Sequence, residues 1–158
     1  MVYFKIIGGE IEPVIEMTAS ELVFDLKRKI KDELEVGVHR QNLWYKGIEL
    51  DNEKRIGFHA LCGDETETVT LVVNPLPSDL KLHVLVKFLG HGSNGYVRVR
   101  ETDMVSDLHG KVSRYWGIPL NTFTLRRLNV EMVHNRPLYA YYINEASEIQ
   151  LSVDIQPR

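Results

Sequence analysis

The side chains that could do chemistry in this 158-residue sequence are six histidines and one cysteine. A helical metal site places two ligands four residues apart, and a cysteine-based site needs paired thiols. The histidines do not show that spacing, and Cys62 has no partner thiol; they are His39, His59, His83, His91, His109 and His134. We therefore expect no metal centre and no cofactor, and we expect Cys62 to be a small core residue in a reducing compartment.

A glycine-rich run from Gly90 to Gly95 is the other feature that could bind a ligand, because such loops can cradle phosphate. Phosphate loops lead into a helix, whose first amides face the anion. Here the run leads into a strand-like segment, residues 96–100, so we interpret it as an elongated hairpin loop. No nucleophile-elbow pattern occurs, and scattered serine, histidine and aspartate residues do not define a catalytic triad. We do not expect an enzyme.

The elements that would position a site occur twice in the same order, beginning with a unit of about 75 residues. Residues 2–6 alternate apolar and polar side chains, a glycine pair supplies a turn, and residues 14–17 begin the return strand. Ser20 is the expected N-cap of a helix with Val23, Leu26, Ile30 and Leu34 on its apolar face and Lys27, Arg28, Lys31 and Asp32 opposite. A strand is predicted at 43–47, a short segment follows at 48–50 beyond a glycine turn, and the last strand is predicted at 69–73.

The second unit repeats this order. Residues 82–86 and 96–100 form a predicted hairpin, and Asp103 is the expected cap of a helix whose apolar face is Val105, Leu108 and Val112. Further apolar residues and a closing strand at 149–153 complete it. Two prolines between Asn74 and Ser78 interrupt regular structure. The predicted domains are therefore residues 1–74 and 79–158, joined by a short linker at 75–78.

The net charge of −3 divides unevenly between the two units. Up to Pro77 there are 9 lysines and arginines against 14 acidic residues, giving −5, and the remainder has 10 against 8, giving +2. Neither unit has the strongly basic character of a dedicated nucleic-acid binder. No apolar run approaches the roughly 18 residues of a membrane span, and the N-terminus begins directly with a strand-like segment. We expect a soluble protein of the cytoplasm, the nucleus or both, without membrane insertion.

Several of these segments resemble ubiquitin in order, in spacing and in their recurrence. The segments that carry the resemblance are 26–30, 43–50 and 69–73 in the first unit, and 117–119, 138–143 and 149–151 in the second. The resemblance covers nearly the whole chain and implies an α+β fold class. It predicts two tandem β-grasp (ubiquitin-like) domains, each a mixed β-sheet packed on one main helix.

The resemblance also implies a function. Ubiquitin-like domains without catalytic residues act as protein-interaction modules, so we expect an adaptor whose partners are proteins, including ubiquitin-pathway or proteasomal receptors. Conjugated members of the family end in a flexible tail with two glycines, whereas this sequence ends at Gln156-Pro157-Arg158. We expect the chain as given not to be conjugated. If the chain is truncated, a tandem modifier attached covalently to proteins is the alternative.

The apolar patch that ubiquitin presents on its outer sheet face has matching positions in the first unit. They are Trp44, Thr70 and Val72, with Ile48 beside them. Trp44 has the large apolar area and single polar handle of an interface anchor. Alternatively, it packs on the neighbouring domain or shields its own sheet. The resemblance also places His59 where the family has a buried tyrosine, which implies a structural hydrogen bond.

The matching positions in the second unit are mostly polar. They are Arg126, Gln150 and Ser152, with Leu89 as the remaining apolar residue. Strand alternation predicts a basic face formed by Lys87, Arg98, Arg100 and Arg126. That face could bind an acidic partner, an anionic surface, RNA or the acidic first domain, or it could be a solvated sheet face.

Overall fold

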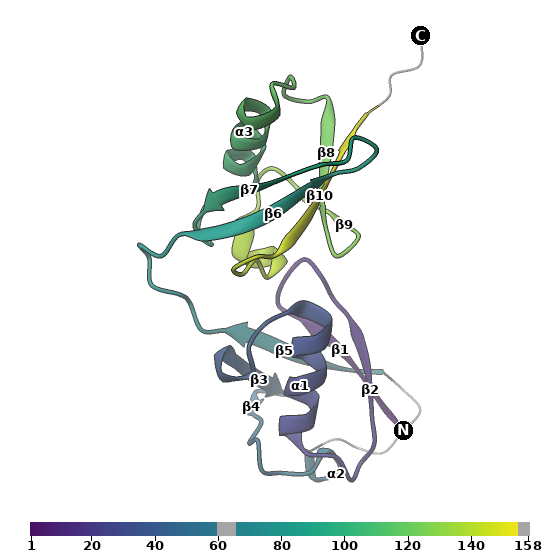
Figure 1. Cartoon of the computed structure of the whole chain (residues 1–158). Coiled ribbons are helices and arrows are strands. Elements are labelled where there is room, and N and C mark those ends of the chain that lie inside the picture. Colours follow the sequence, from purple (N-terminus) through teal and green to yellow (C-terminus); the bar gives the residue numbers. More distant parts are fainter. Residues whose placement is uncertain (60–65, 155–158) are drawn as a thin grey trace. The chain divides into compact units, whose positions relative to one another are not determined.

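The structure is a computed structural model that describes residues 1–59, apart from the side chain of His59, and residues 66–154. The expectations for Cys62 and for the His59 side chain lie outside the described residues. The chain divides into two compact units, Met1–Pro75 and Leu76–Arg158 (Figure 1). The boundary between the units falls at the start of the predicted linker. Leu76 belongs to the second unit, where its N–H donates to the Glu101 carboxylate over 2.6 Å.

The first unit is a five-stranded mixed sheet with one long helix. Its sheet has the order β2-β1-β5-β3-β4, in which β1 and β5 run parallel and the other neighbours antiparallel. In chain order its elements are β1 (Val2–Ile7), β2 (Val14–Met17), α1 (Val23–Leu34), η1 (Val38–Arg40), β3 (Gln41–Tyr45), β4 (Ile48–Glu49), α2 (Ile56–His59) and β5 (Thr66–Val73).

The second unit repeats this topology. Its sheet has the order β7-β6-β10-β8-β9, with β6 and β10 parallel. In chain order its elements are β6 (Leu82–Phe88), β7 (Ser93–Val99), α3 (Val105–Trp116), β8 (Phe123–Arg127), β9 (Val130–Glu131), η2 (Leu138–Tyr141) and β10 (Glu148–Val153). The predicted α+β architecture of two tandem β-grasp units is therefore confirmed.

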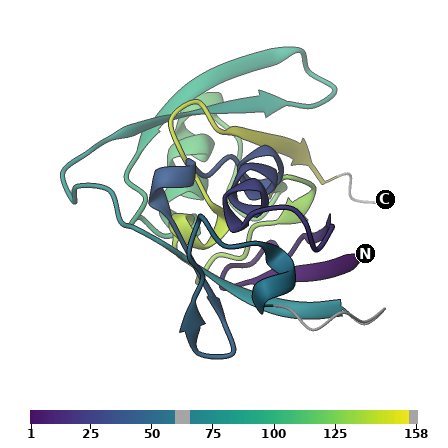
Figure 2. The same ribbon diagram turned by 90° about the horizontal axis from the view of Figure 1, so that it is seen from below.

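Each long helix packs its apolar face against its own sheet. Figure 2 shows α1 on one side of the strands β1 and β5. All apolar residues predicted for the two helix faces are fully buried, because apolar side chains three and four residues apart share one side of a helix. Lys27 was predicted on the polar face of α1, and this is wrong, since its side chain is buried. Desolvation lowers the pKa of Lys27.

The start of each helix lies further along the chain than predicted. Ser20 and Asp103 are not the N-caps, and the capping positions are instead apolar, Leu22 and Met104. An aspartate three residues into each helix accepts the N–H of the capping residue, at 2.9 Å from Leu22 to Asp25 and at 3.0 Å from Met104 to Asp107. These apolar caps also form isolated β-bridges. The side chain of Asp103 accepts the Arg100 N–H instead.

The glycine-rich run of the second unit is shorter as a loop than predicted. Strand β7 begins at Ser93, which pairs with Phe88, so the hairpin loop comprises only residues 89–92. Gly95 lies inside the strand, opposite Val86. Gly90 and Gly92 have positive φ, which glycine adopts without steric cost and which the tight reversal requires.

Candidate interaction surfaces

Trp44, Thr70 and Val72 lie together on the outer face of the first sheet. Trp44 pairs directly with Thr70 across β3 and β5, and Val72 follows two residues along β5, opposite Asn42. The intervening Leu43 and Leu71 are buried, and alternation along a strand points their neighbours to the opposite face. Trp44 is 38% exposed and Val72 49% exposed, so an apolar surface is accessible to a partner.

Ile48 lies apart from these three residues. The register of the β3–β4 hairpin pairs Ile48 with the buried Tyr45, whereas Glu49 pairs with Trp44. Directly opposed residues of an antiparallel pair share one side of the sheet, so Glu49 is the cross-strand neighbour of the indole. Ile48 follows the two-residue turn and lies on the opposite side of the sheet from Trp44. Its side chain is 62% exposed.

Polar contacts at one end of β3 and β5 fix the backbone that carries this surface. The Asn42 side-chain amide donates to the Val72 carbonyl over 3.3 Å and to the Asn74 side-chain oxygen over 2.7 Å. The Arg40 guanidinium donates to the Asn74 carbonyl at 3.0 and 2.8 Å. Since these bonds close the ends of both strands, the surface is preformed and needs little ordering when a partner binds.

The matching face of the second unit is polar. Gln150 pairs with Lys87 on one side and with Arg126 on the other, and Arg126 in turn pairs with Glu131. The Arg126 guanidinium donates to the Ser152 hydroxyl over 3.4 Å. Leu89, the apolar residue predicted here, is exposed in the β6–β7 loop. The positions that match Trp44 and Thr70 therefore carry polar side chains in this unit.

The residues of the predicted basic face come from β6, β7 and β8 and from the residue after β7. Lys87 makes an ion pair with Glu148 at 2.6 Å, and Arg126 lies opposite Glu131 across β8 and β9. Arg98 pairs with His83 and lies between the buried Val97 and Val99, so alternation places it on the same outer side as Lys87, and Arg100 directly follows β7.

Sequence reasoning missed two buried polar residues in the second unit, Arg127 and His109. Arg127, on the inner face of β8, is fully buried and donates to the carbonyls of Glu148 and Tyr142, each over 3.4 Å. His109 is buried on α3 between Phe123 and His134, at ring-centroid distances of 5.0 and 4.0 Å. Burial, with a smaller effect of His134, lowers the pKa of His109 to about 4.

The internal repeat relates these two residues to buried polar side chains of the first unit. Counting from the start of each helix, His109 occupies the position of the buried Lys27. Counting along β3 and β8, Arg127 occupies the position of the buried Tyr45, whose hydroxyl donates to Glu67 over 2.9 Å. Both positions therefore accept a polar group at the core boundary in either unit.

Within residues 1–59 and 66–154, no group of three or more histidine, cysteine, aspartate or glutamate side chains is arranged to hold a metal ion. In the same part of the chain, no helix is long and apolar enough to cross a membrane.

Residues 2–76 match the model of the ubiquitin family. Among solved structures, the chain is similar to the solution NMR structure of a ubiquitin-like domain from an Arabidopsis thaliana protein, with 32% identity and a TM-score of 0.45. That similarity covers 49% of this chain and 82% of the other. No curated protein matches the sequence. By its first unit the chain belongs to the ubiquitin family, and its second unit repeats the same fold.

Proposed function

We propose that this chain is a non-catalytic adaptor of the ubiquitin pathway that binds receptor proteins through the outer sheet face of its first unit. Ubiquitin-like domains generally mediate protein interactions, and such an adaptor acts in the cytoplasm or the nucleus. The observation that carries the proposal is the group formed by Trp44, Thr70 and Val72. Its tryptophan and valine are accessible on a backbone held by side-chain hydrogen bonds.

Trp44 is the expected energetic centre of the contact. Tryptophan is enriched among the few interface residues that carry most of the binding energy, because it buries a large apolar area with few rotatable bonds. Thr70 lies directly across from the indole, and Val72 extends the apolar area along β5. The polar residues around them, Asn42 and Glu49, suit the rim of an interface, where water remains accessible.

The second unit should not bind the same receptors. At the positions of Trp44 and Thr70 it has Arg126 and Gln150, which pair with each other across β8 and β10. An apolar receptor surface would desolvate the Arg126 guanidinium without replacing its hydrogen bonds, and that desolvation costs free energy. The two outer sheet faces therefore favour different partners.

The first test is the substitution Trp44→Ala, measured by calorimetric titration of the full chain with purified receptor domains that bind ubiquitin. We expect the substitution to weaken binding by about 2 kcal/mol or more, roughly 30-fold, while the fold is retained. The matched control is Ile48→Ala, which removes a more exposed apolar side chain from the other side of the hairpin. We expect that control to change the affinity by less than about threefold, because exposed side chains outside a contact contribute little.

Two outcomes would contradict the proposal. One is unchanged receptor binding by a Trp44→Ala protein whose amide spectrum is still dispersed. The other is a larger loss from Ile48→Ala than from Trp44→Ala, which would move the contact to the opposite side of the hairpin.

The division into domains 1–74 and 79–158 with a linker at 75–78 is proposed as well. Each unit has its own buried apolar core and its own complete sheet. We therefore expect residues 1–75 and 76–158, expressed separately, each to give a dispersed amide spectrum and a cooperative unfolding transition. A collapsed spectrum from either piece would show that the units depend on each other to fold.

A further inference from the structure

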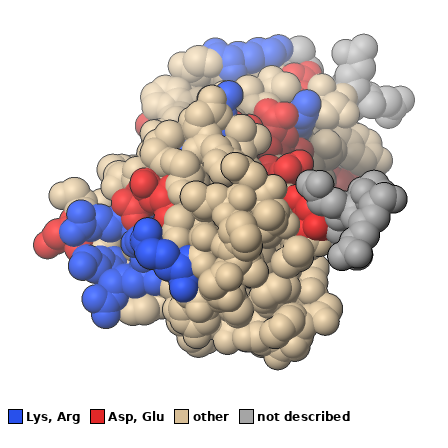
Figure 3. All heavy atoms as spheres, turned by 90° about the horizontal axis from the view of Figure 1, so that it is seen from above, with Lys and Arg blue, Asp and Glu red and all other residues tan. Residues whose placement is uncertain are grey.

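Four cations surround a hollow of about 210 Å³ at the end of strand β7. They are Lys81, Arg98, Arg100 and Lys111, and Val99 and Asp103 complete the lining. We call this site the basic hollow. Figure 3 shows a group of lysine and arginine side chains on the left, the side on which Figure 1 places the end of β7. Because a single acidic residue accompanies the cations, the lining carries a net positive charge.

Hydrogen bonds hold the backbone of the basic hollow in place. The Arg100 N–H donates to the Asp103 carboxylate over 2.8 Å, and the Asp103 N–H donates back to the Arg100 carbonyl over 3.0 Å. The Lys111 ammonium donates to the Arg98 carbonyl over 2.7 Å and lies 3.9 Å from the Asp103 carboxylate. The backbone around the hollow is therefore preformed, which lowers the cost of ordering it when a ligand binds.

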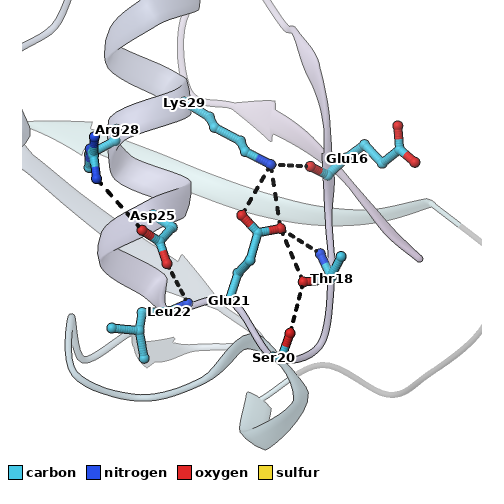
Figure 4. Close-up of polar contacts among 8 residues, drawn as sticks. All are labelled: Glu16, Thr18, Ser20, Glu21, Leu22, Asp25, Arg28 and Lys29. Atoms are coloured by element: carbon cyan, nitrogen blue, oxygen red, sulfur yellow. Dashed lines mark hydrogen bonds and ion pairs between the residues drawn. The ribbon is translucent and has the colours of Figure 1, made fainter.

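The first unit contains the same backbone frame. Its Thr18 N–H donates to the Glu21 carboxylate over 2.9 Å. Its Lys29 ammonium donates to the Glu16 carbonyl over 2.9 Å and lies 3.3 Å from the Glu21 carboxylate (Figure 4). Counting along the two equivalent helices, Lys29 is the counterpart of Lys111. The lysine that joins helix and strand is therefore a structural residue in both units.

The other three cations of the basic hollow have no counterpart in the first unit. Counting from the paired strand residues, Lys81, Arg98 and Arg100 occupy positions at which the first unit has methionine, glutamate and threonine. Since the first unit builds the same frame without these cations, the fold does not require them. They are available to bind a ligand.

These three cations also lack an acidic partner. Within residues 1–59 and 66–154, no carboxylate oxygen lies within 4.0 Å of the charged nitrogens of Lys81, Arg98 or Arg100. The Lys111 ammonium and the Asp103 carboxylate, by contrast, offset each other. Uncompensated cations around a concave surface concentrate a positive potential there, which attracts anionic groups.

We propose that the basic hollow binds a small ligand that carries several phosphate groups on one ring, of the inositol polyphosphate class. A phosphate monoester has nearly two negative charges and three strong acceptor oxygens, so two such groups can satisfy two guanidinium groups and an ammonium together. Arg98 and Arg100 are two residues apart, roughly 6.5 Å in an extended chain, which allows each to contact a different phosphate group.

The size and the charge of the basic hollow favour this ligand over longer polyanions. A volume of about 210 Å³ suits the phosphate-bearing side of a small ring, and the net charge of +2 on this unit is below that of a nucleic-acid binder. The contacts come from side chains and require no added strand. A free inositol polyphosphate and a phosphoinositide headgroup share this chemistry. The site is separate from the one proposed on the first unit.

The probe is inositol hexakisphosphate, titrated into the full chain and followed by calorimetry. We expect saturable binding whose affinity falls as salt is raised. Inositol hexasulfate, in which each group carries only a single negative charge, should bind at least tenfold more weakly. In the amide spectrum of the isotope-labelled chain, the phosphate probe should cause its largest shift changes at Val99 and Asp103.

The variant that tests the basic hollow is Arg98→Glu with Arg100→Thr, the residues that the first unit carries at these positions. We expect it to keep a dispersed amide spectrum and to bind inositol hexakisphosphate at least tenfold more weakly. The control is Arg28→Glu with Lys31→Gln at exposed positions of α1, which likewise replaces one cation by an anion and one by a neutral residue. That control should change the affinity by less than about threefold, since separated surface charges are screened by salt.

Vesicles distinguish the two sources of the phosphate groups. The full chain is sedimented with vesicles that contain phosphatidylinositol bisphosphate or, at equal charge, phosphatidylserine. Binding to the phosphoinositide vesicles alone, lost in the Arg98→Glu, Arg100→Thr variant, would support a lipid headgroup as the ligand. Binding of inositol hexakisphosphate without binding to either vesicle would support a free inositol polyphosphate.

Several results would overturn the proposal. They are no binding of inositol hexakisphosphate at millimolar protein, equal binding of inositol hexasulfate, or unchanged binding by the Arg98→Glu, Arg100→Thr variant. Tighter binding of a short single-stranded RNA or of an acidic peptide, lost in the same variant, would replace the inositol polyphosphate by another class of ligand.

Discussion

Replacing Arg127 by alanine is expected to lower the free energy of unfolding of the second unit by about 3 to 5 kcal/mol. The side chain is fully buried, so its removal leaves a cavity. It also removes the hydrogen bonds to the Glu148 and Tyr142 carbonyls. These bonds hold the first residue of β10 and the segment before it against β8. A loss of this size is a large fraction of the stability of a small domain, so we expect the variant to be only marginally folded at 37 °C.

The measurement is urea unfolding followed by the fluorescence of Trp116, in a Trp44→Phe background that leaves no second tryptophan. The control is Arg126→Ala on the same strand, whose side chain faces outward and is only partly buried. We expect that control to cost less than about 1 kcal/mol, as is usual for surface substitutions. If both substitutions lowered the free energy of unfolding equally, Arg127 would contribute no more to stability than a surface arginine.

Acidification is the second large effect, and we expect it to destabilise the second unit through His109. In the unfolded chain this histidine titrates near 6.5, whereas burial lowers its pKa in the folded unit to about 4. Between these values the unfolded state binds a proton that the folded state does not. The contribution of neutral His109 is therefore full above pH 6.5 and is lost as the pH falls towards 4, by about 3 kcal/mol in all.

The test compares urea unfolding of the parent chain and of His109→Leu between pH 7.5 and pH 4.5, again through Trp116. Carboxylates titrate in the lower part of this range in both proteins, so the difference between the two is the readout. His134, which lies against His109, stays in both. The leucine variant should lose much less stability on acidification. If the unfolding free energies of both proteins changed with pH in parallel, protonation of His109 would not be the cause of the acid destabilisation.

Sequence reasoning was most successful where a periodic pattern is repeated. The apolar positions of both long helices and the order of the strands were predicted correctly because burial alone determines them. Strand alternation also predicted that Trp44, Thr70 and Val72 face away from the helix. These predictions need only the period of each element, which is a local property of the chain.

The predictions that were wrong depend on contacts between distant residues. Apolar Leu22 and Met104 are the helix caps because each lies in a β-bridge to a distant segment, which outweighs the preference for a polar cap. The register of the β3–β4 hairpin, which separates Ile48 from Trp44, follows from the turn geometry. Similarly, the ion pair of Lys87 with Glu148 becomes visible only when the strands are placed.

The central claim is that receptors bind the outer face of the first sheet, and nuclear magnetic resonance titration of the isotope-labelled full chain tests it most directly. On addition of a ubiquitin-binding receptor domain, we predict that the largest shift changes fall on the Trp44 indole N–H and on the amides of Thr70 and Val72. The matching amides of Arg126 and Gln150 in the second unit should change little. Changes centred on the second unit, or on the α1 side of the first, would contradict the account.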